Sequence, residues 1–192
     1  MTLSKIVAIG GNQPTRDTDV LETLQLAVAE IKNLPGRVEK ISSYYQTPAY
    51  PVGAGPDFVN AALIVDSPLS SHKFLNELHK IEVSLGRVRR DRWGARVVDL
   101  DLIADGGQVL PDIDTWRRWH DLAPDRQQVE TPDQLILPHP RMQNRSFVLV
   151  PLVEICPEWV HPVLGRTIAE MHADLTEEDR NSVVKLGDRA CQ

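Results

Sequence analysis

The chain has 192 residues, a length that fits one domain, and its formal net charge is −6. The negative charge argues against general nucleic-acid binding, and no apolar run approaches the length of a transmembrane helix. Residues 1–10 lack the layout of a signal peptide, and Cys156 and Cys191 form no metal-binding spacing. We therefore expect a cytoplasmic protein with reduced thiols and with no nucleic-acid or membrane partner.

The first half of the chain predicts alternating strands and helices. Ile6–Ile9 is a short buried strand that ends at the turn Gly10–Asn12. Apolar residues at helical spacing predict a helix over Asp17–Lys32. A second strand is expected over Val38–Gln46, and the proline- and glycine-rich segment Thr47–Pro56 is a loop long enough for a functional role.

The second half continues the alternation. The predicted elements are a strand over Phe58–Asp66, a helix over Pro68–Gly86, a strand over Val97–Ile103, a turn with a short strand within Ala104–Leu110, an apolar core segment over Val148–Ile155 and a final short helix over Gly165–His172. Together these elements give the order strand, helix, strand, strand, helix, strand. That order predicts a ferredoxin-like α+β sandwich, with a mainly antiparallel sheet, two long helices on one face and additional C-terminal strands and helices.

Residues 111–132 form an insertion that is dense in charged and aromatic side chains. Trp116 and Trp119 are three positions apart, so one helical turn can place both on one side. We expect a loop with a short helix that packs against the body or contacts a subunit. The pattern predicts a single domain over residues 1–174, followed by a loose, charged tail over 175–192.

Asp99 and Asp101 lie two positions apart on the strand Val97–Ile103, so both carboxylates share one face, about 7 Å apart. The intervening aliphatic residues share the other face and can enter a core. Two ionised carboxylates this close repel each other unless a cation lies between them. Mg²⁺ is commonly held by one or two carboxylates plus substrate phosphates. Taken alone, the pair can also be a solvated face of the strand.

A basic loop directly precedes this strand. It holds five arginines, whose planar donors suit phosphate oxygens, namely Arg87, Arg89, Arg90, Arg92 and Arg96. Trp93 and Gly94 lie in the same loop, a combination that suggests a segment able to close over a ligand. A carboxylate pair beside such a loop is typical of a magnesium–nucleotide site. We expect this site at the end of the sheet where residues 47–56, 86–96 and 139–147 converge.

The segment Arg92–Ile103, R-W-G-A-R-V-V-D-L-D-L-I, resembles the signature of the 6-hydroxymethyl-7,8-dihydropterin pyrophosphokinases, a family of folate-pathway enzymes. Two further motifs carry the resemblance. The pattern I-E-x-x-x-G-R matches at Ile81–Arg87, and P-H-x-x-x-x-x-R-x-F matches at Pro138–Phe147. The resemblance covers roughly residues 4–167. The insertion at 111–132 departs from it, because shorter members of the family lack some twenty of these residues.

The resemblance implies transfer of a pyrophosphoryl group from ATP, the co-substrate, to 6-hydroxymethyl-7,8-dihydropterin, with release of AMP. It also implies two Mg²⁺ ions held by Asp99 and Asp101. The implied catalytic residues are Arg87, Arg92, Arg96, Asp99 and Asp101. The implied ATP-binding residues are Glu82, Arg87, Trp93, Arg96, His139 and Arg145. For Glu82, a solvated side chain and a role in orienting the loop arginines are the alternatives.

For the pterin, the resemblance implies a pocket formed by Thr47, Pro48, Tyr50, Phe58, Asn60 and Phe147. Asn60 would hydrogen-bond the ring, and Phe58 and Phe147 would stack on its opposite faces. An asparagine satisfied by the backbone is the alternative for Asn60. His79, Pro140 and Gln143 differ from residues common in the family, so their contacts with ATP stay open.

Three other classes of protein are alternatives. Another magnesium-dependent phosphoryl-transfer enzyme, such as a D-x-D hydrolase, would need further carboxylates or histidines, and none is clearly arranged for that. A non-catalytic ferredoxin-like binding module explains the fold but not the coincidence of motifs. An RNA-binding module is disfavoured by the net charge and by the lack of an aromatic sheet motif. We therefore predict a monomeric, ATP-dependent pyrophosphokinase.

Overall fold

The structure is a computed structural model that describes residues 3–49, 55–87, 96–123, 126 and 129–187. Within these residues, one six-stranded sheet has the order β5-β1-β4-β3-β6, and β2 also pairs with β4. The strands are β1 (Leu3–Gly11), β2 (Arg37–Ile41), β3 (Tyr45–Thr47), β4 (Phe58–Ser67), β5 (Asp99–Asp105) and β6 (Val184–Lys185). Their pairings are antiparallel, which confirms the predicted ferredoxin-like α+β sheet.

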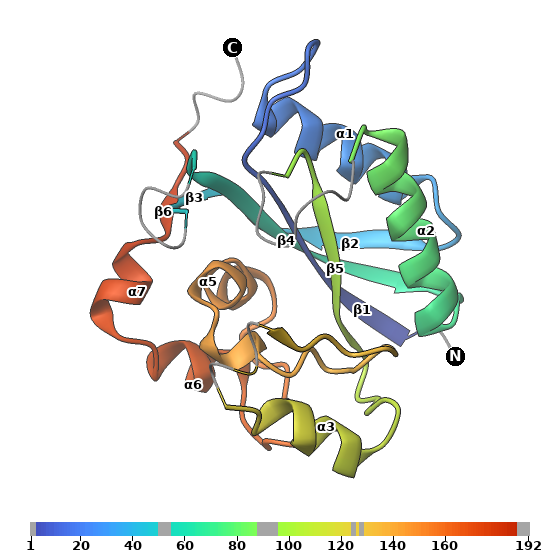
Figure 1. The fold of residues 1–192 in the computed structure, drawn as a ribbon, viewed down its shortest axis with the longest axis vertical. Coiled ribbons are helices and arrows are strands. Elements are labelled where there is room, and N and C mark those ends of the chain that lie inside the picture. Colours follow the sequence, from blue (N-terminus) through green and yellow to red (C-terminus); the bar gives the residue numbers. More distant parts are fainter. Residues whose placement is uncertain (1–2, 50–54, 88–95, 124–125, 127–128, 188–192) are drawn as a thin grey trace.

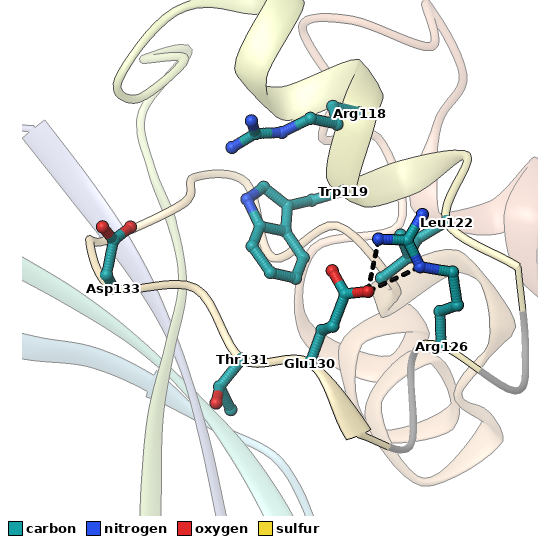
Figure 2. Close-up of a pocket in the computed structure, with 7 residues that line it drawn as sticks. All are labelled: Arg118, Trp119, Leu122, Arg126, Glu130, Thr131 and Asp133. Atoms are coloured by element: carbon teal, nitrogen blue, oxygen red, sulfur yellow. Dashed lines mark hydrogen bonds and ion pairs between the residues drawn. The ribbon is translucent and has the colours of Figure 1, made fainter.

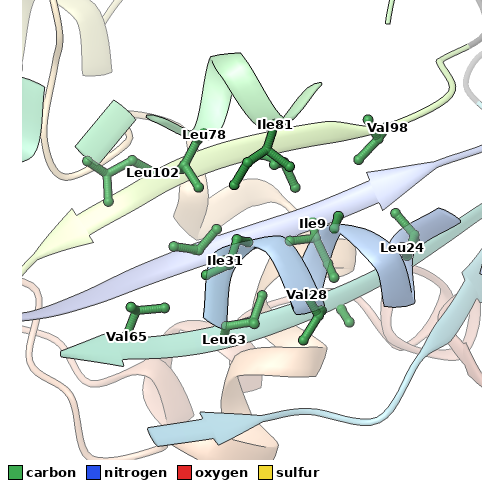
Figure 3. Close-up of a cluster of buried hydrophobic side chains, with 14 of the residues drawn as sticks. Ile9, Leu24, Val28, Ile31, Leu63, Val65, Leu78, Ile81, Val98 and Leu102 are labelled. Carbon is green, nitrogen blue, oxygen red and sulfur yellow. The ribbon is translucent and has the colours of Figure 1, made fainter. Parts of the chain in front are cut away.

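Two long helices, α1 (Val20–Lys32) and α2 (Ser71–Ser84), cover one face of the sheet, as predicted (Figure 1). Each begins at a capping side chain, because Asp19 accepts a hydrogen bond from Glu22 N and Ser70 accepts one from Lys73 N. The core between these helices and the sheet includes Ile9, Leu24, Val28, Ile31, Leu63, Val65, Leu78, Ile81, Val98 and Leu102 (Figure 3). The apolar spacing that predicted the helices is therefore the spacing of this core.

The opposite face of the sheet is covered by α5 (Ser146–Ile155), with α6 (Ile168–Ala173) packed against it. Successive side chains of a strand point to opposite faces, so each central strand supplies both cores. On β5, Leu100 and Leu102 enter the core under α1 and α2, whereas Ile103 enters the core under α5. No helix among the described residues has the length and apolar character needed to cross a bilayer.

The insertion carries α3 (Ile113–His120), the short helix expected there, and it packs against the body. Trp116 is 1% exposed, and its indole Nε1 donates a hydrogen bond of 2.7 Å to the carbonyl oxygen of Pro138. Its ring stacks on His120 at 4.8 Å between centroids and meets the edge of His161 at 5.1 Å. Trp116 therefore anchors the insertion to the segments that precede and follow α5.

The structure differs from the strand predictions in the middle of the chain. The strand expected over Val38–Gln46 is two strands, β2 and β3, which pair with successive parts of β4. Ser42 lies between them, and its hydroxyl accepts a hydrogen bond of 2.9 Å from Ala62 N. That side-chain contact takes the place of a ladder bond and allows the chain to bend. The short strand expected within 104–110 is reduced to one bridge, between Leu110 and Leu137.

The prediction of a loose tail after residue 174 is wrong for the residues described up to 187. The segment forms α7 (Glu177–Asn181), capped by Thr176, and then β6. β6 adds to the outer edge of β3, and Leu186 N donates a 2.9 Å hydrogen bond to Tyr44 O. An edge strand offers unpaired backbone groups, so a short polar segment can order there although its own sequence pattern is weak.

Candidate active site

The two predicted carboxylates lie together at the start of β5. Leu100 and Leu102 are buried on one face of this strand, so Asp99 and Asp101 project to the other face, as the D-L-D spacing predicts. Their side chains are 21% and 47% exposed. Desolvation and the neighbouring Asp99 carboxylate raise the pKa of Asp101 to about 6. The pair is therefore a concentration of negative charge at the surface of the sheet.

Three arginines from separate parts of the chain surround this pair. Arg87 Nη1 lies 2.6 Å from Asp99 Oδ1, and Arg96 forms an ion pair with Asp99 Oδ2. Arg145 approaches from the start of α5, with its Nη1 3.9 Å from Asp101 Oδ2. The structure thus brings residues 87, 96 and 145 to the same carboxylates. Guanidinium groups so placed can also donate to phosphate oxygens.

Glu82 lies behind Arg87 at the end of α2 and is only 1% exposed. Its Oε1 accepts a 2.8 Å hydrogen bond from Leu100 N, an edge donor of β5, and it also forms an ion pair with Arg87. Burial raises the pKa of Glu82 to about 7, against the lowering effects of these donors. Glu82 thus positions Arg87 between itself and Asp99, which agrees with the alternative of a residue that orients the loop arginines. Its contact with ATP stays a prediction.

The residues predicted for the pterin meet at the neighbouring end of β3 and β4. Asn60 Nδ2 donates a 2.8 Å hydrogen bond to Thr47 Oγ1 across the paired strands, and both residues are buried. Phe58 is half-buried at the start of β4, and Pro48 is exposed just after β3. A side chain at position 10 would collide with Asn60, since a Cβ at Gly10 would lie 2.5 Å from Asn60 Oδ1.

The segment 139–147 runs alongside β5 and reaches the carboxylates. His139 N donates a 2.7 Å hydrogen bond to Ile103 O, and its Nδ1 accepts one of 3.2 Å from Arg141 N. Burial, together with the charges of Arg145 and Arg141, lowers the pKa of His139 well below its usual range. The ring is therefore neutral, with Nε2 as its donor. Phe147 is 38% exposed, and the Arg145 guanidinium lies 5.5 Å from its ring centroid.

Several sequence predictions fall outside the described residues or find no contact with the carboxylates. Tyr50, Arg92 and Trp93 belong to the first group. Gln143 Nε2 donates to Pro140 O within its own turn. The contacts of these residues with ATP or pterin stay predictions.

Sequence reasoning missed one residue at this site, Asn12, which it assigned only to a turn. Asn12 is 4% exposed, and its side chain contacts residues in two other loops. The sequence signal for this role was weak. It is only that a polar amide directly follows a buried strand and a glycine pair, and such an amide must find hydrogen-bond partners if it is buried.

A separate pocket of about 460 Å³ lies in the insertion (Figure 2). It is lined by Arg118, Trp119, Leu122, Arg126, Glu130, Thr131 and Asp133. Arg126 and Glu130 form an ion pair across one side, and the Arg118 guanidinium carbon lies 5.9 Å from the centre of the Trp119 ring. The insertion follows the far end of β5, roughly 20 Å along the strand from Asp99, so this pocket is not part of the carboxylate site.

Comparison with known sequences identifies similar proteins. A family model described as 7,8-dihydro-6-hydroxymethylpterin-pyrophosphokinase (HPPK) matches residues 6–157. A 2-amino-4-hydroxy-6-hydroxymethyldihydropteridine pyrophosphokinase from Synechocystis sp. is 38% identical over 167 residues, which cover 86% of this chain and 73% of that protein. The protein of the same name from Haemophilus influenzae is 31% identical over 160 residues, covering 83% of this chain and 86% of its own.

Solved structures show the same arrangement of elements. A double variant of Plasmodium falciparum HPPK-DHPS, with pterin and p-hydroxybenzoate, aligns with a TM-score of 0.65 at 14% identity. The alignment covers 90% of this chain and 43% of that longer one. The wild-type protein aligns with a TM-score of 0.60 at 15% identity. At these identities the likeness shows the fold alone.

Proposed function

The chain belongs to the 7,8-dihydro-6-hydroxymethylpterin-pyrophosphokinase family, and from this membership we infer that it transfers pyrophosphate from ATP to hydroxymethyldihydropterin in folate biosynthesis. The observation at the site that carries this function is the carboxylate pair of β5, Asp99 and Asp101, surrounded by Arg87, Arg96 and Arg145. This combination of donors and acceptors suits a polyphosphate with bound cations. Membership in the family also argues against a non-catalytic module.

Two Mg²⁺ ions are proposed at Asp99 and Asp101. No group of three or more histidine, cysteine, aspartate or glutamate side chains within the described part of the chain is arranged to hold a metal. That fits Mg²⁺, which usually takes one or two carboxylates and completes its shell with water and substrate phosphates. When bound, such ions neutralise the charge that develops on the reacting phosphates. They would also relieve the repulsion that raises the pKa of Asp101.

The arginines supply the remaining positive charge. Arg87, Arg96 and Arg145 are held by the protein's own carboxylates, so their guanidinium groups are oriented before substrate binds. Phosphoryl transfer depends on positioning and on electrostatic stabilisation more than on covalent chemistry. Arg87 and Arg96 would bind the phosphates that flank the bond to be broken, and Arg145 would bind the transferred group. The neutral His139 would donate from Nε2 to a phosphate or ribose oxygen.

The pterin is proposed to lie between Phe58 and Phe147, with Asn60 and Thr47 at its edge. Phe147 is exposed on the same side of the sheet as Asp101, and Phe58 is only half-buried. Flat aromatic side chains stack favourably on a planar heterocycle. The Asn60 amide is held by Thr47, so its remaining donor and acceptor positions have a fixed direction.

In the proposed reaction, the hydroxymethyl oxygen forms a bond to the β-phosphorus of ATP. The bond between that phosphorus and the α–β bridging oxygen breaks, so the electron pair leaves with AMP. The hydroxyl proton is released to solvent or to a carboxylate of the site. The residues named above hold the two substrates in line and exclude alternative geometries.

The experiment that tests this function is an assay for AMP with ATP, Mg²⁺ and 6-hydroxymethyl-7,8-dihydropterin, run with and without the pterin. AMP that appears only with the pterin supports the reaction. ADP, or AMP without pterin, favours another magnesium-dependent phosphoryl-transfer enzyme. The monomeric state, the cytoplasmic location and the absence of nucleic-acid binding stay predictions, and gel filtration measures the first of them.

A further inference from the structure

We propose that Asn12 is a positioning residue that fixes the ends of two loops relative to each other, one loop for each substrate. One loop precedes β4 and ends at Pro56, next to the proposed pterin pocket. The other precedes β5 and ends at Arg96, next to the proposed phosphate site. The inference rests on the proposed function, because it assigns one loop to each substrate.

Asn12 binds both backbone groups of Arg96. Its Oδ1 accepts a 2.8 Å hydrogen bond from Arg96 N, and its own backbone N donates one of 2.9 Å to Arg96 O. Gln13 N donates a further bond of 3.1 Å to the same carbonyl. The Arg96 side chain forms an ion pair with Asp99. By holding the backbone of Arg96, Asn12 therefore fixes the point from which the Arg96 side chain extends to Asp99.

The same amide reaches the other loop. Asn12 Nδ2 donates a 3.1 Å hydrogen bond to Pro56 O, two residues before Phe58. The amide thus uses its acceptor on the phosphate side and its donor on the pterin side. An amide group has both functions at one carbon atom, which a carboxylate or a hydroxyl cannot reproduce in the same geometry.

The backbone next to Asn12 packs closely against the segment at Val97, which requires glycine at position 11. A Cβ at Gly11 would lie 2.6 Å from Val97 O, so a side chain at position 11 would push apart the segments that Asn12 joins. Asn12 is 4% exposed, so an amide left without these partners would be buried and unsatisfied. Such a loss typically costs roughly 5- to 150-fold in an equilibrium. The glycine and the asparagine together therefore form one junction.

Two substitutions separate the contacts of Asn12. Asn12→Asp keeps an oxygen acceptor for Arg96 N but replaces the donor to Pro56 O by a second oxygen. We expect it to raise KM for the pterin roughly tenfold and to leave KM for ATP within about twofold of wild type. Asn12→Ala removes both side-chain contacts, so we expect both KM values to rise. Gln13→Ala is the matched control, because Gln13 contacts Arg96 through its main chain and its side chain is exposed.

Amide hydrogen exchange at Arg96 gives a readout that does not need activity. We expect Asn12→Ala to accelerate this exchange about tenfold and Asn12→Asp to leave it unchanged, because only the first removes the acceptor. If Asn12→Ala does not fold, the two KM values of Asn12→Asp decide the question. Equal changes in the two KM values of Asn12→Asp, or a lower Tm of that variant with both KM values unchanged, would overturn the positioning role. A wild-type enzyme without pterin-dependent AMP refutes the proposed function instead, while the exchange rates still test the junction.

Discussion

A buried ion pair joins β1, β5 and α2 at the end of the sheet away from the carboxylate site. Lys5 Nζ lies 2.9 Å from both carboxylate oxygens of Asp105, and each side chain is 1% exposed. Ser71 Oγ donates a 2.7 Å hydrogen bond to the same carboxylate. The Lys5 ammonium also lies 5.6 Å from the ring centroid of Phe74. The ion pair is therefore almost fully buried, and its carboxylate accepts hydrogen bonds from two side chains.

Removing one partner should be far more costly than removing both. We expect Asp105→Asn to lower the free energy of unfolding by about 3–5 kcal/mol, because it leaves the Lys5 charge buried without its counter-ion. Replacing both residues, as in Lys5→Met with Asp105→Leu, should cost much less and can even stabilise the fold, because the desolvation penalty of both charges disappears. The predicted signature is a double variant more stable than the Asp105→Asn single variant.

Urea denaturation followed by circular dichroism measures these differences. The control is the surface pair of Lys80 and Glu77, which has the same chemistry at 2.8 Å but side chains that are 71% and 34% exposed. We expect Glu77→Gln to change stability by at most about 1 kcal/mol. A loss below about 1 kcal/mol for Asp105→Asn would refute the reasoning, since it would mean that the buried site is wet or that the lysine is not charged there.

Further predictions concern the site and the insertion. Asp99→Ala and Asp101→Ala should each lower turnover at least about 10²-fold in the AMP assay, and near-wild-type rates would remove the metal assignment. Phe147→Ala should weaken pterin binding in calorimetry with ATP affinity unchanged, whereas a loss confined to ATP would contradict its placement. Burial, and then the charge of His120, lowers the pKa of His161 to about 4. Because the unfolded chain binds more protons than the folded one between about pH 6.5 and 4, stability should fall by roughly 2–3 kcal/mol as the pH drops through that window. His161→Gln should flatten this dependence in urea titrations, and an unchanged slope would contradict it.

The local elements and the carboxylate pair could be predicted from the sequence because they depend on short-range spacing. Helix α1 begins directly after Asp19 and α2 directly after Ser70, two capping residues that precede helical apolar spacing. The alternation of β5 places Leu100 in the core and, by the same geometry, Asp99 and Asp101 on the opposite face. These features follow from periods of 3.6 and 2 residues.

The partners of these residues depend on the tertiary structure alone. Arg145 reaches Asp101 from the start of α5, and Glu82 reaches Leu100 N from the end of α2. Asn12 joins the loop ends at Pro56 and Arg96, which lie far apart in the chain. Sequence spacing does not show which distant segments become neighbours, because the packing of the whole sheet and of the helices on its two faces decides that.

The tail and the second strand show the same limit in the fold. β6 orders because the edge of β3 offers it backbone partners, and Ser42 divides the expected strand because its hydroxyl binds Ala62 N on β4. The sequence by itself determined the two long helices, the strands β1, β4 and β5, the polarity of their faces and the chemistry of the carboxylate and arginine motifs. The tertiary structure decided which charges neutralise one another and which backbone groups are paired, since both require atoms that are close in space but distant in the chain.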